Sequence, residues 1–108
     1  MNLLEETEEI LKNNNKTLLD IEWFGCRGFE VPISKLIDLL DVKYDSGFGS
    51  PEVVTDLVLV GKDFWLERHE YDGSEWWEYK SIPKRPLVKF SVDKLVGDLW
   101  PTLEDLKK

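Results

Sequence analysis

The stretch that decides the fold is residues 56–82, DLVLVGKDFWLERHEYDGSEWWEYKSI. It reads as three consecutive strands, because short apolar and aromatic runs alternate with turn residues. Its clearest signal is Asp72-Gly73, which lies between two aromatic-rich runs. This dipeptide favours the two positive φ angles of a type I′ turn, whose twist matches the strands that it joins. The sequence therefore predicts an antiparallel hairpin with a two-residue loop.

The loop length sets the register of the hairpin. A two-residue loop places Tyr71 opposite Ser74, and from there the pairs run His69–Trp76, Arg68–Trp77 and Leu66–Tyr79. The predicted core face carries Phe64, Leu66, Trp77 and Tyr79. The predicted solvent face carries Trp65, Glu67, His69, Tyr71, Trp76, Glu78 and Lys80. A three-residue loop would instead pair Arg68 with Glu78, because a one-residue slip changes every cross-strand pair.

The rest of the chain supplies helices and further strands. Apolar residues at helical spacing predict helices over residues 3–13 and 33–42 and a third helix capped by Ser91 and covering 92–99. Strands are expected at 17–24, 29–31 and 57–60, with the last in the centre of the sheet, and 87–90 is expected to be extended. Thr102 is expected to start one last helical turn. The order α-β-β-α-β-β-β-(β)-α predicts one α+β domain over residues 1–108, with an antiparallel sheet of four to six strands packed on one face by three helices.

Composition narrows the possible functions. The chain has 108 residues and a net charge of −8, so we expect no direct binding to nucleic-acid phosphates. It has no long apolar run and no basic, apolar leader, so neither a membrane span nor a secretory signal is predicted. The single cysteine, Cys26, fits a reducing compartment. The expected location is the cytoplasm of a bacterial host.

One pattern favours an enzyme. Asp63 followed by Glu78-Tyr79-Lys80 loosely resembles the D…(E/D)xK signature of restriction-endonuclease-like nucleases. The resemblance implies that the acidic pair binds a divalent metal and that the lysine activates water. A small metal-dependent hydrolase or nuclease using Asp63, Glu78 and Lys80 is therefore one alternative. The predicted register places Asp63 near Ile82, away from Glu78, which weighs against it.

Two further alternatives use the charged residues differently. Glu67, His69 and Glu78 share a face and could form a metal or acid–base site, although one histidine with two glutamates does not define a zinc site. The acidic balance is also compatible with a nucleic-acid mimic that inhibits a DNA-binding protein. No catalytic residue, cofactor or metal ligand is assigned from the sequence.

The leading hypothesis is binding to a protein partner whose identity the sequence does not specify. Tryptophan and tyrosine dominate the energetics of protein interfaces, and the chain has five tryptophans. The predicted partner-binding residues lie on the solvent face of the hairpin and in the loop before it: Trp65, Glu67, His69, Tyr71, Trp76, Glu78, Tyr44 and Phe48.

The middle of the chain also carries a resemblance. The run VGKDFWLERHEYDGSEWWEYK at residues 60–80, with YDSGFG at 44–49, resembles small proteins carried by phages and prophages of Gram-positive bacteria. That group brings no established activity or site residues. The resemblance implies a small accessory protein that engages a host or phage protein.

Overall fold

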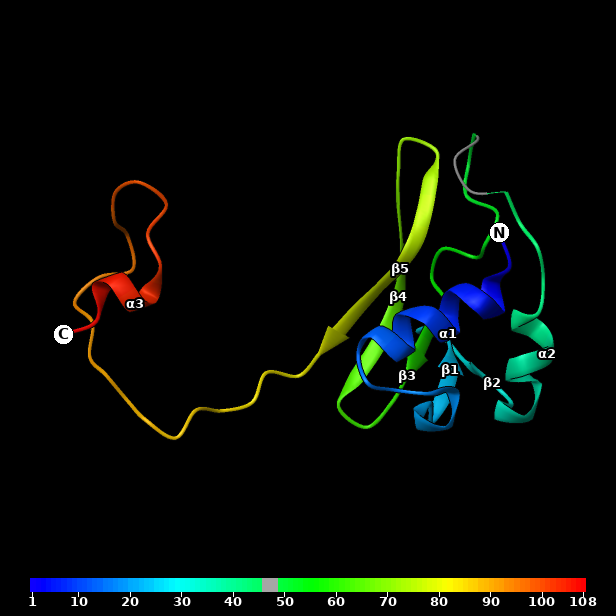
Figure 1. Ribbon diagram of the computed structural model, residues 1–108, viewed down its shortest axis with the longest axis horizontal. Coiled ribbons are helices and arrows are strands. Elements are labelled where there is room, and N and C mark those ends of the chain that lie inside the picture. Colours follow the sequence, from blue (N-terminus) through cyan, green and yellow to red (C-terminus); the bar gives the residue numbers. More distant parts are fainter. Residues whose placement is uncertain (46–48) are drawn as a thin grey trace.

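The protein is an α+β structure built on one antiparallel sheet. The computed structural model describes residues 1–45 and 49–108. Five strands form a sheet in the order β2-β1-β3-β4-β5 (Figure 1). The elements in chain order are α1 (Leu3–Asn13), a 3-10 turn (Leu18–Asp20), β1 (Trp23–Gly25), β2 (Glu30–Val31), a 3-10 turn (Ile33–Lys35), α2 (Leu36–Leu40), β3 (Val58–Val60), β4 (Phe64–Tyr71), β5 (Ser74–Ser81) and α3 (Leu103–Leu106).

The β4–β5 hairpin confirms the predicted turn and register. Asp72 and Gly73 have φ angles of 49° and 85°, the positive values that the type I′ turn requires. Tyr71 pairs with Ser74, and the ladder continues through Arg68–Trp77 and Leu66–Tyr79. The predicted central strand is also confirmed, because β3 lies between β1 and β4.

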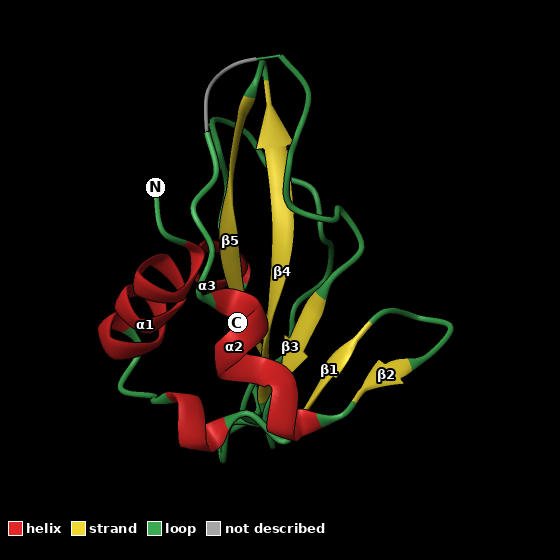
Figure 2. Cartoon of the chain, turned by 90° about the vertical axis from the view of Figure 1, so that its right-hand side faces the viewer, coloured by secondary structure: helices red, strands yellow, loops and turns green. Residues whose placement is uncertain are grey.

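Helix α1 covers one face of the sheet, as both views show (Figures 1 and 2). Asn2 caps its start by accepting the N–H of Glu5 at 2.9 Å. Leu3, Thr7 and Leu11 are buried at four-residue intervals, so they form the stripe of α1 that faces the core.

The segment before β1 differs from the predicted strand over 17–24. Thr17 and Asp20 form a capping box and hold a 3-10 turn over Leu18–Asp20, and β1 begins only at Trp23. Local hydrogen bonds from threonine and aspartate compete with the sheet ladder, which is why the strand is short. Leu19, which lies within this 3-10 turn, is exposed.

The second helix is shorter than predicted. Its first turn is a 3-10 turn, and α2 proper covers only Leu36–Leu40. Leu36 and Leu40 are buried, but Ile33 and Ile37 are exposed. Of the four apolar residues at helical spacing in the predicted helix, only two therefore face the core.

The C-terminal region departs most from expectation. The predicted helix over 92–99 does not form, and the only helix there is α3, where Thr102 accepts the N–H of Asp105 in a capping box. Figure 1 shows α3 at the far end of the chain from the sheet. The helices that pack on the sheet face are thus α1 and α2, and the region after β5 leads away from them.

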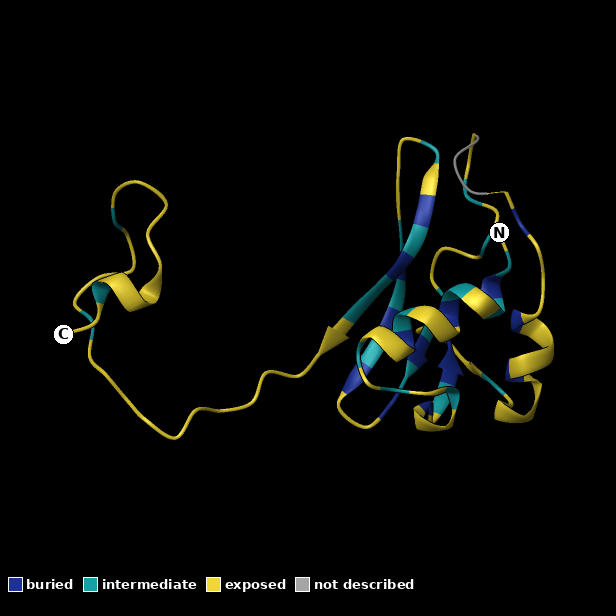
Figure 3. Cartoon of the chain, viewed as in Figure 1, coloured by how far each residue is buried: buried dark blue, intermediate teal, exposed yellow. Residues whose placement is uncertain are grey.

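The core lies between α1, α2 and the covered face of the sheet, where the buried residues gather (Figure 3). It consists of Leu3, Leu11, Ile21, Phe24, Leu36, Leu40, Tyr44, Leu59, Phe64, Leu66 and Trp77. No helix among the described residues is long and apolar enough to cross a bilayer.

Candidate functional site

The sheet face opposite α1 carries aromatic and acidic side chains in rows that cross the strands. One row runs through Trp23, Val60, Trp65 and Lys80, and the next runs through Glu30, Gly25, Val58, Glu67 and Glu78. A third row holds His69 and Trp76. We call the following set the aromatic face: Trp23, Glu30, Val58, Val60, Trp65, Glu67, His69, Trp76, Glu78 and Lys80.

The tryptophans of the aromatic face are only half-buried. Trp65 and Trp76 have intermediate exposure, whereas their neighbour Trp77 points to the other side of the sheet and is 4% exposed. The alternation of side chains along a strand produces this contrast. Indole rings therefore remain accessible to water on one side of the hairpin, as predicted.

Carboxylates hold both indoles in place. Trp65 donates its Nε1–H to Glu67 at 2.7 Å, and Trp76 donates its Nε1–H to Glu78 at 3.2 Å. Each bond joins residues two apart on one strand, which point to the same face. The rings are thus presented in a fixed orientation, which reduces the entropy lost on binding.

Glu67 has a second partner in His69, whose Nε2 lies 2.7 Å from its Oε2. The hydrogen bond from Trp65, followed by that from His69, lowers the pKa of Glu67 below its usual value of 4.5. The carboxylate therefore keeps its charge at neutral pH.

The acidic row gives the aromatic face a negative centre. Glu67 and Glu78 are paired directly across the ladder, and Glu30 occupies the same row on β2. Like charges directly opposite each other destabilise a sheet. A cation placed between these carboxylates would relieve the repulsion.

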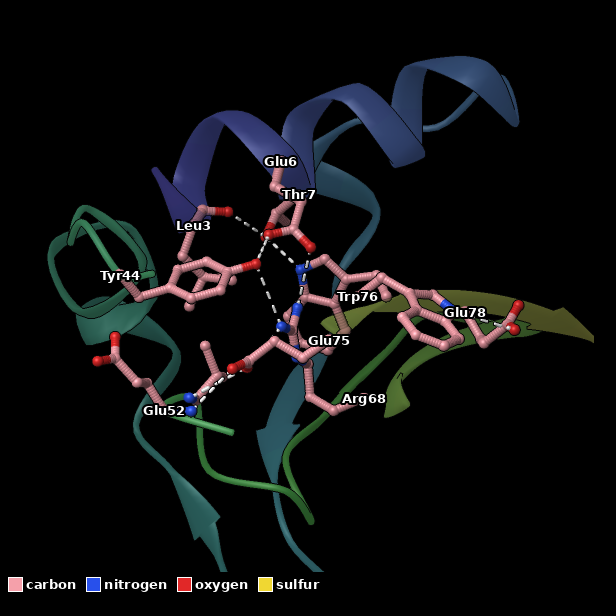
Figure 4. Close-up of polar contacts among 11 residues, drawn as sticks. Leu3, Glu6, Thr7, Tyr44, Glu52, Arg68, Glu75, Trp76 and Glu78 are labelled. Carbon is pink, nitrogen blue, oxygen red and sulfur yellow. Dashed lines mark hydrogen bonds and ion pairs between the residues drawn. The ribbon is translucent and has the colours of Figure 1, made fainter. Parts of the chain in front are cut away.

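The opposite side of the hairpin holds a buried charge network around Arg68 (Figure 4). Its guanidinium forms ion pairs with Glu6 of α1 at 3.1 Å and with Glu75 of β5 at 3.0 Å. It also donates to the hydroxyl of Tyr44, which in turn donates to Glu6. The network ties α1, β4, β5 and the segment after α2 together.

Aromatic rings enclose the Arg68 cation. The ring of Trp77 lies 4.8 Å from the guanidinium carbon, and that of Tyr44 lies 5.5 Å from it. Burial opposes the charged form of Arg68, but its bonds to Tyr44, Glu6 and Glu75 outweigh burial and raise its pKa. Burial, followed by the bond to Glu6, raises the pKa of Tyr44 to about 12. Tyr44 is therefore a neutral donor at physiological pH.

Glu75 anchors the loop that precedes β3. Its carboxylate accepts the backbone N–H groups of Glu52 at 2.7 Å and Val53 at 3.2 Å. Burial alone would raise the pKa of Glu75, but these two donors and Arg68 together hold it below 4.5. Arg68 and Glu75 thus have structural roles that fix the hairpin to the body.

The structure separates the predicted partner-binding residues into three groups. Trp65, Glu67, His69, Trp76 and Glu78 share the aromatic face, and Tyr71 is exposed at the end of β4. Tyr44 is buried in the Arg68 network, so its predicted place on a binding surface is wrong. The prediction for Phe48 lies outside the described residues.

The predicted nuclease residues are not brought together. Asp63 is exposed and lies 3.6 Å from Lys16, and its carbonyl accepts the N–H of Ile82. Glu78 belongs to the acidic row, three positions of the ladder away from Ser81, the partner of Phe64. Within residues 1–45 and 49–108, no group of three or more His, Cys, Asp or Glu side chains is arranged to hold a metal ion.

Sequence reasoning missed several residues on both faces. Trp23 and Glu30 extend the aromatic face across β1 and β2, where a shallow depression of about 340 Å³ adjoins them. The strand registers of β2 with β1 and of β1 with β3 place them there, and no local pattern encodes those registers. Arg68 lies two residues after Leu66 on β4, and Glu75 lies two residues before Trp77 on β5. The alternation of side chains along a strand therefore indicated that both point inward.

The helix side of the sheet also holds an apolar cavity of about 420 Å³ next to α2. Its lining includes Leu40, Val42, Val53 and Leu57. It continues the core, and Lys43, Tyr44 and Glu52 are the polar residues in its otherwise apolar lining.

Comparisons with known proteins give no family for this chain. A scan against protein-family models, a search of curated proteins and a search of solved structures each found no match.

Proposed function

We propose that this chain is a non-enzymatic accessory protein that acts by binding another protein through the aromatic face. The observation that carries the proposal is the contrast between Trp77, which is buried, and Trp65 and Trp76, which stay partly exposed with their N–H groups held by carboxylates. Oriented indoles beside charged groups are the residues that contribute most to protein interfaces. The resemblance to phage and prophage proteins remains a prediction about its origin.

The chemistry of the face defines the kind of partner. Tryptophan rows lie on both sides of the acidic row formed by Glu30, Glu67 and Glu78. The complementary ligand is an extended segment that carries a basic side chain between apolar ones. Such a segment would place its cation between Glu67 and Glu78 and its apolar groups on the indoles.

The alternatives have less support. A hydrolase using Asp63, Glu78 and Lys80 needs these side chains to converge on one metal, whereas Asp63 lies beside Lys16. A nucleic-acid mimic needs its carboxylates on one surface. Here α1, which carries four glutamates, covers one face of the sheet (Figure 2), whereas the register places the acidic row on the other face.

Affinity capture from a bacterial host, read by mass spectrometry, tests the proposal. We expect Trp65→Ala with Trp76→Ala to keep the fold and to lose a protein that the wild-type chain retains. The matched control is Leu19→Ala with Ile37→Ala, which removes two exposed apolar side chains from the helix side. Equal retention by the wild type and both variants, or unfolding of the tryptophan variant, would contradict the proposal.

A further inference from the structure

The segment that follows β5 buries none of its side chains. Residues 82–90, IPKRPLVKF, are all exposed, and Figure 3 shows the connection from β5 to α3 in the yellow of exposed residues. The radius of gyration is 18.2 Å, whereas a compact chain of this length has about 13 Å. Ordering a segment costs about 1–2 kcal/mol per residue. A segment that gains no burial in its own chain is therefore suited to gain it from another molecule. We call residues 82–108 the arm.

The arm and the rest of the chain carry opposite charges. Residues 1–81 hold 8 basic and 18 acidic side chains, a balance of −10, and residues 82–108 hold 6 and 4, a balance of +2. Lys84, Arg85 and Lys89 lie in residues 82–90, which contain no acidic side chain. The arm thus has the chemistry that the aromatic face selects, a cation among apolar groups.

The spacing of the two surfaces also agrees. Successive rows of the aromatic face are two residues apart on β4, at Trp65 and Glu67. Two residues of an extended chain span about 6.8 Å. In an extended arm Leu87 and Lys89 point to the same side with this spacing. Leu87 can therefore lie on the Trp65 row while Lys89 reaches the acidic row.

The arm is directed away from its own aromatic face. The N–H of Ile82 donates to Asp63 at 2.8 Å, so the chain leaves β5 in the direction of the strand. Pro83 follows at once and Pro86 comes three residues later, and proline holds both itself and the residue before it in extended conformations. Figure 1 shows the resulting path, which leads away from the sheet. Reversal onto the same copy is thus disfavoured.

We propose that the arm of one copy binds the aromatic face of a second copy, with Lys89 between Glu67 and Glu78 and Leu87 against Trp65. Reciprocal exchange gives a closed two-fold dimer, which is the common outcome when an identical element is swapped between protomers. This inference rests on the proposed function, because it names the occupant of the same surface.

A charge-swap experiment on full-length chains tests the exchange. The arm-reversed variant carries Lys84→Glu, Arg85→Glu and Lys89→Glu, and the face-reversed variant carries Glu30→Lys and Glu78→Lys. Analytical ultracentrifugation should show a wild-type dimer, a monomer for each variant alone, and a dimer when the two variants are mixed. In the mixture each arm meets a face of opposite charge. The control, Lys12→Glu, Lys35→Glu and Lys62→Glu, has the net charge of the arm-reversed variant and should stay dimeric.

Several outcomes would overturn the exchange. A monomeric wild-type chain would overturn it. This holds whether the radius of gyration stays large or falls to about 13 Å because the arm closes on the face of its own copy. A dimer that survives arm reversal would also overturn it. If the face-reversed variant fails to fold, the arm-reversed variant still decides, because its substitutions lie in a segment without buried side chains. Affinity capture with the arm-reversed variant tests the proposed function separately, since its aromatic face is unchanged.

Discussion

The two faces of the β4–β5 hairpin both carry tryptophans and charged residues, but the faces differ in how these charges are paired and how far the indoles are buried. On the helix side, Arg68 lies between Glu6 and Glu75 and against Trp77, so its charge is matched by neighbours. On the open side, Glu67 and Glu78 are paired across the ladder, and the indoles beside them stay accessible. Burial requires charges to be paired. Among the described residues of its rows, the open side carries Glu30, Glu67 and Glu78 against the single cation Lys80, so it keeps a net negative charge that a cation from a partner can neutralise.

The largest expected effect comes from removing the buried cation. Arg68→Met should lower the free energy of unfolding by about 3–5 kcal/mol, because Glu6 and Glu75 lose their shared partner. Arg27→Met removes an exposed arginine and should change it by less than about 0.5 kcal/mol. Urea unfolding measures both. A similar small effect for both variants would mean that the Arg68 network does not hold the hairpin to α1.

Neighbouring tryptophans provide a comparison of the two faces with one residue type. Trp77→Ala should cost about 3–5 kcal/mol of unfolding free energy, because it empties a core position and removes the 2.8 Å bond to Thr7. Trp76→Ala should cost about 1 kcal/mol, because its ring is only partly buried and leaves no enclosed cavity when it is removed. Thermal and urea unfolding report the difference. Equal losses would show that both rings are core residues.

Part of the pH dependence of stability should come from the helix side. The pKa of Glu75 is lowered in the folded state, so its contribution is present above 4.5, its value in the unfolded chain, and is lost as pH falls through the lower folded value. Glu75→Gln should cost about 1–3 kcal/mol at pH 7. It should also flatten the fall in stability below pH 4.5. An unchanged acid limb in unfolding curves would contradict this assignment.

The smallest expected effect is an increase, rather than a decrease, in the free energy of unfolding. Glu78→Gln removes one of two facing carboxylates yet keeps an oxygen for the indole of Trp76, so we expect a gain of about 0.2–1 kcal/mol. The same variant should weaken dimerisation, because the arm loses part of its anionic site. A loss of stability would indicate that a cation from the same chain already bridges Glu67 and Glu78.

Local patterns predicted the hairpin, because Asp72-Gly73 determines both turn type and pairing. The same alternation puts Arg68 and Glu75 on the core side with Leu66 and Trp77, but the prediction assigned these two charged residues to neither face. Their inward position depends on Glu6, which lies 62 residues before Arg68 and is brought near it only by the packing of α1. Such long-range pairing is not encoded in either local pattern.

Over residues 92–99 the local pattern predicted a helix that the structure does not form. The spacing of Val92, Leu95, Val96 and Leu99 is helical, but that stripe has no surface to cover, and a short helix is marginal without one. A side chain at Gly97 would also lie 2.9 Å from Pro101, so the chain folds back where the helix was expected. Periodicity predicts a helix only where tertiary packing can bury its apolar side.

Solvent isotope shifts in fluorine NMR test the central claim most directly. The protein would be labelled with 5-fluorotryptophan, its resonances assigned by single substitutions, and the arm-reversed variant used so that the aromatic face is unoccupied. We predict clear shifts between H₂O and D₂O for Trp65 and Trp76 and almost none for Trp77. Equal protection of Trp76 and Trp77 would contradict the division of the hairpin into a packed face and a binding face.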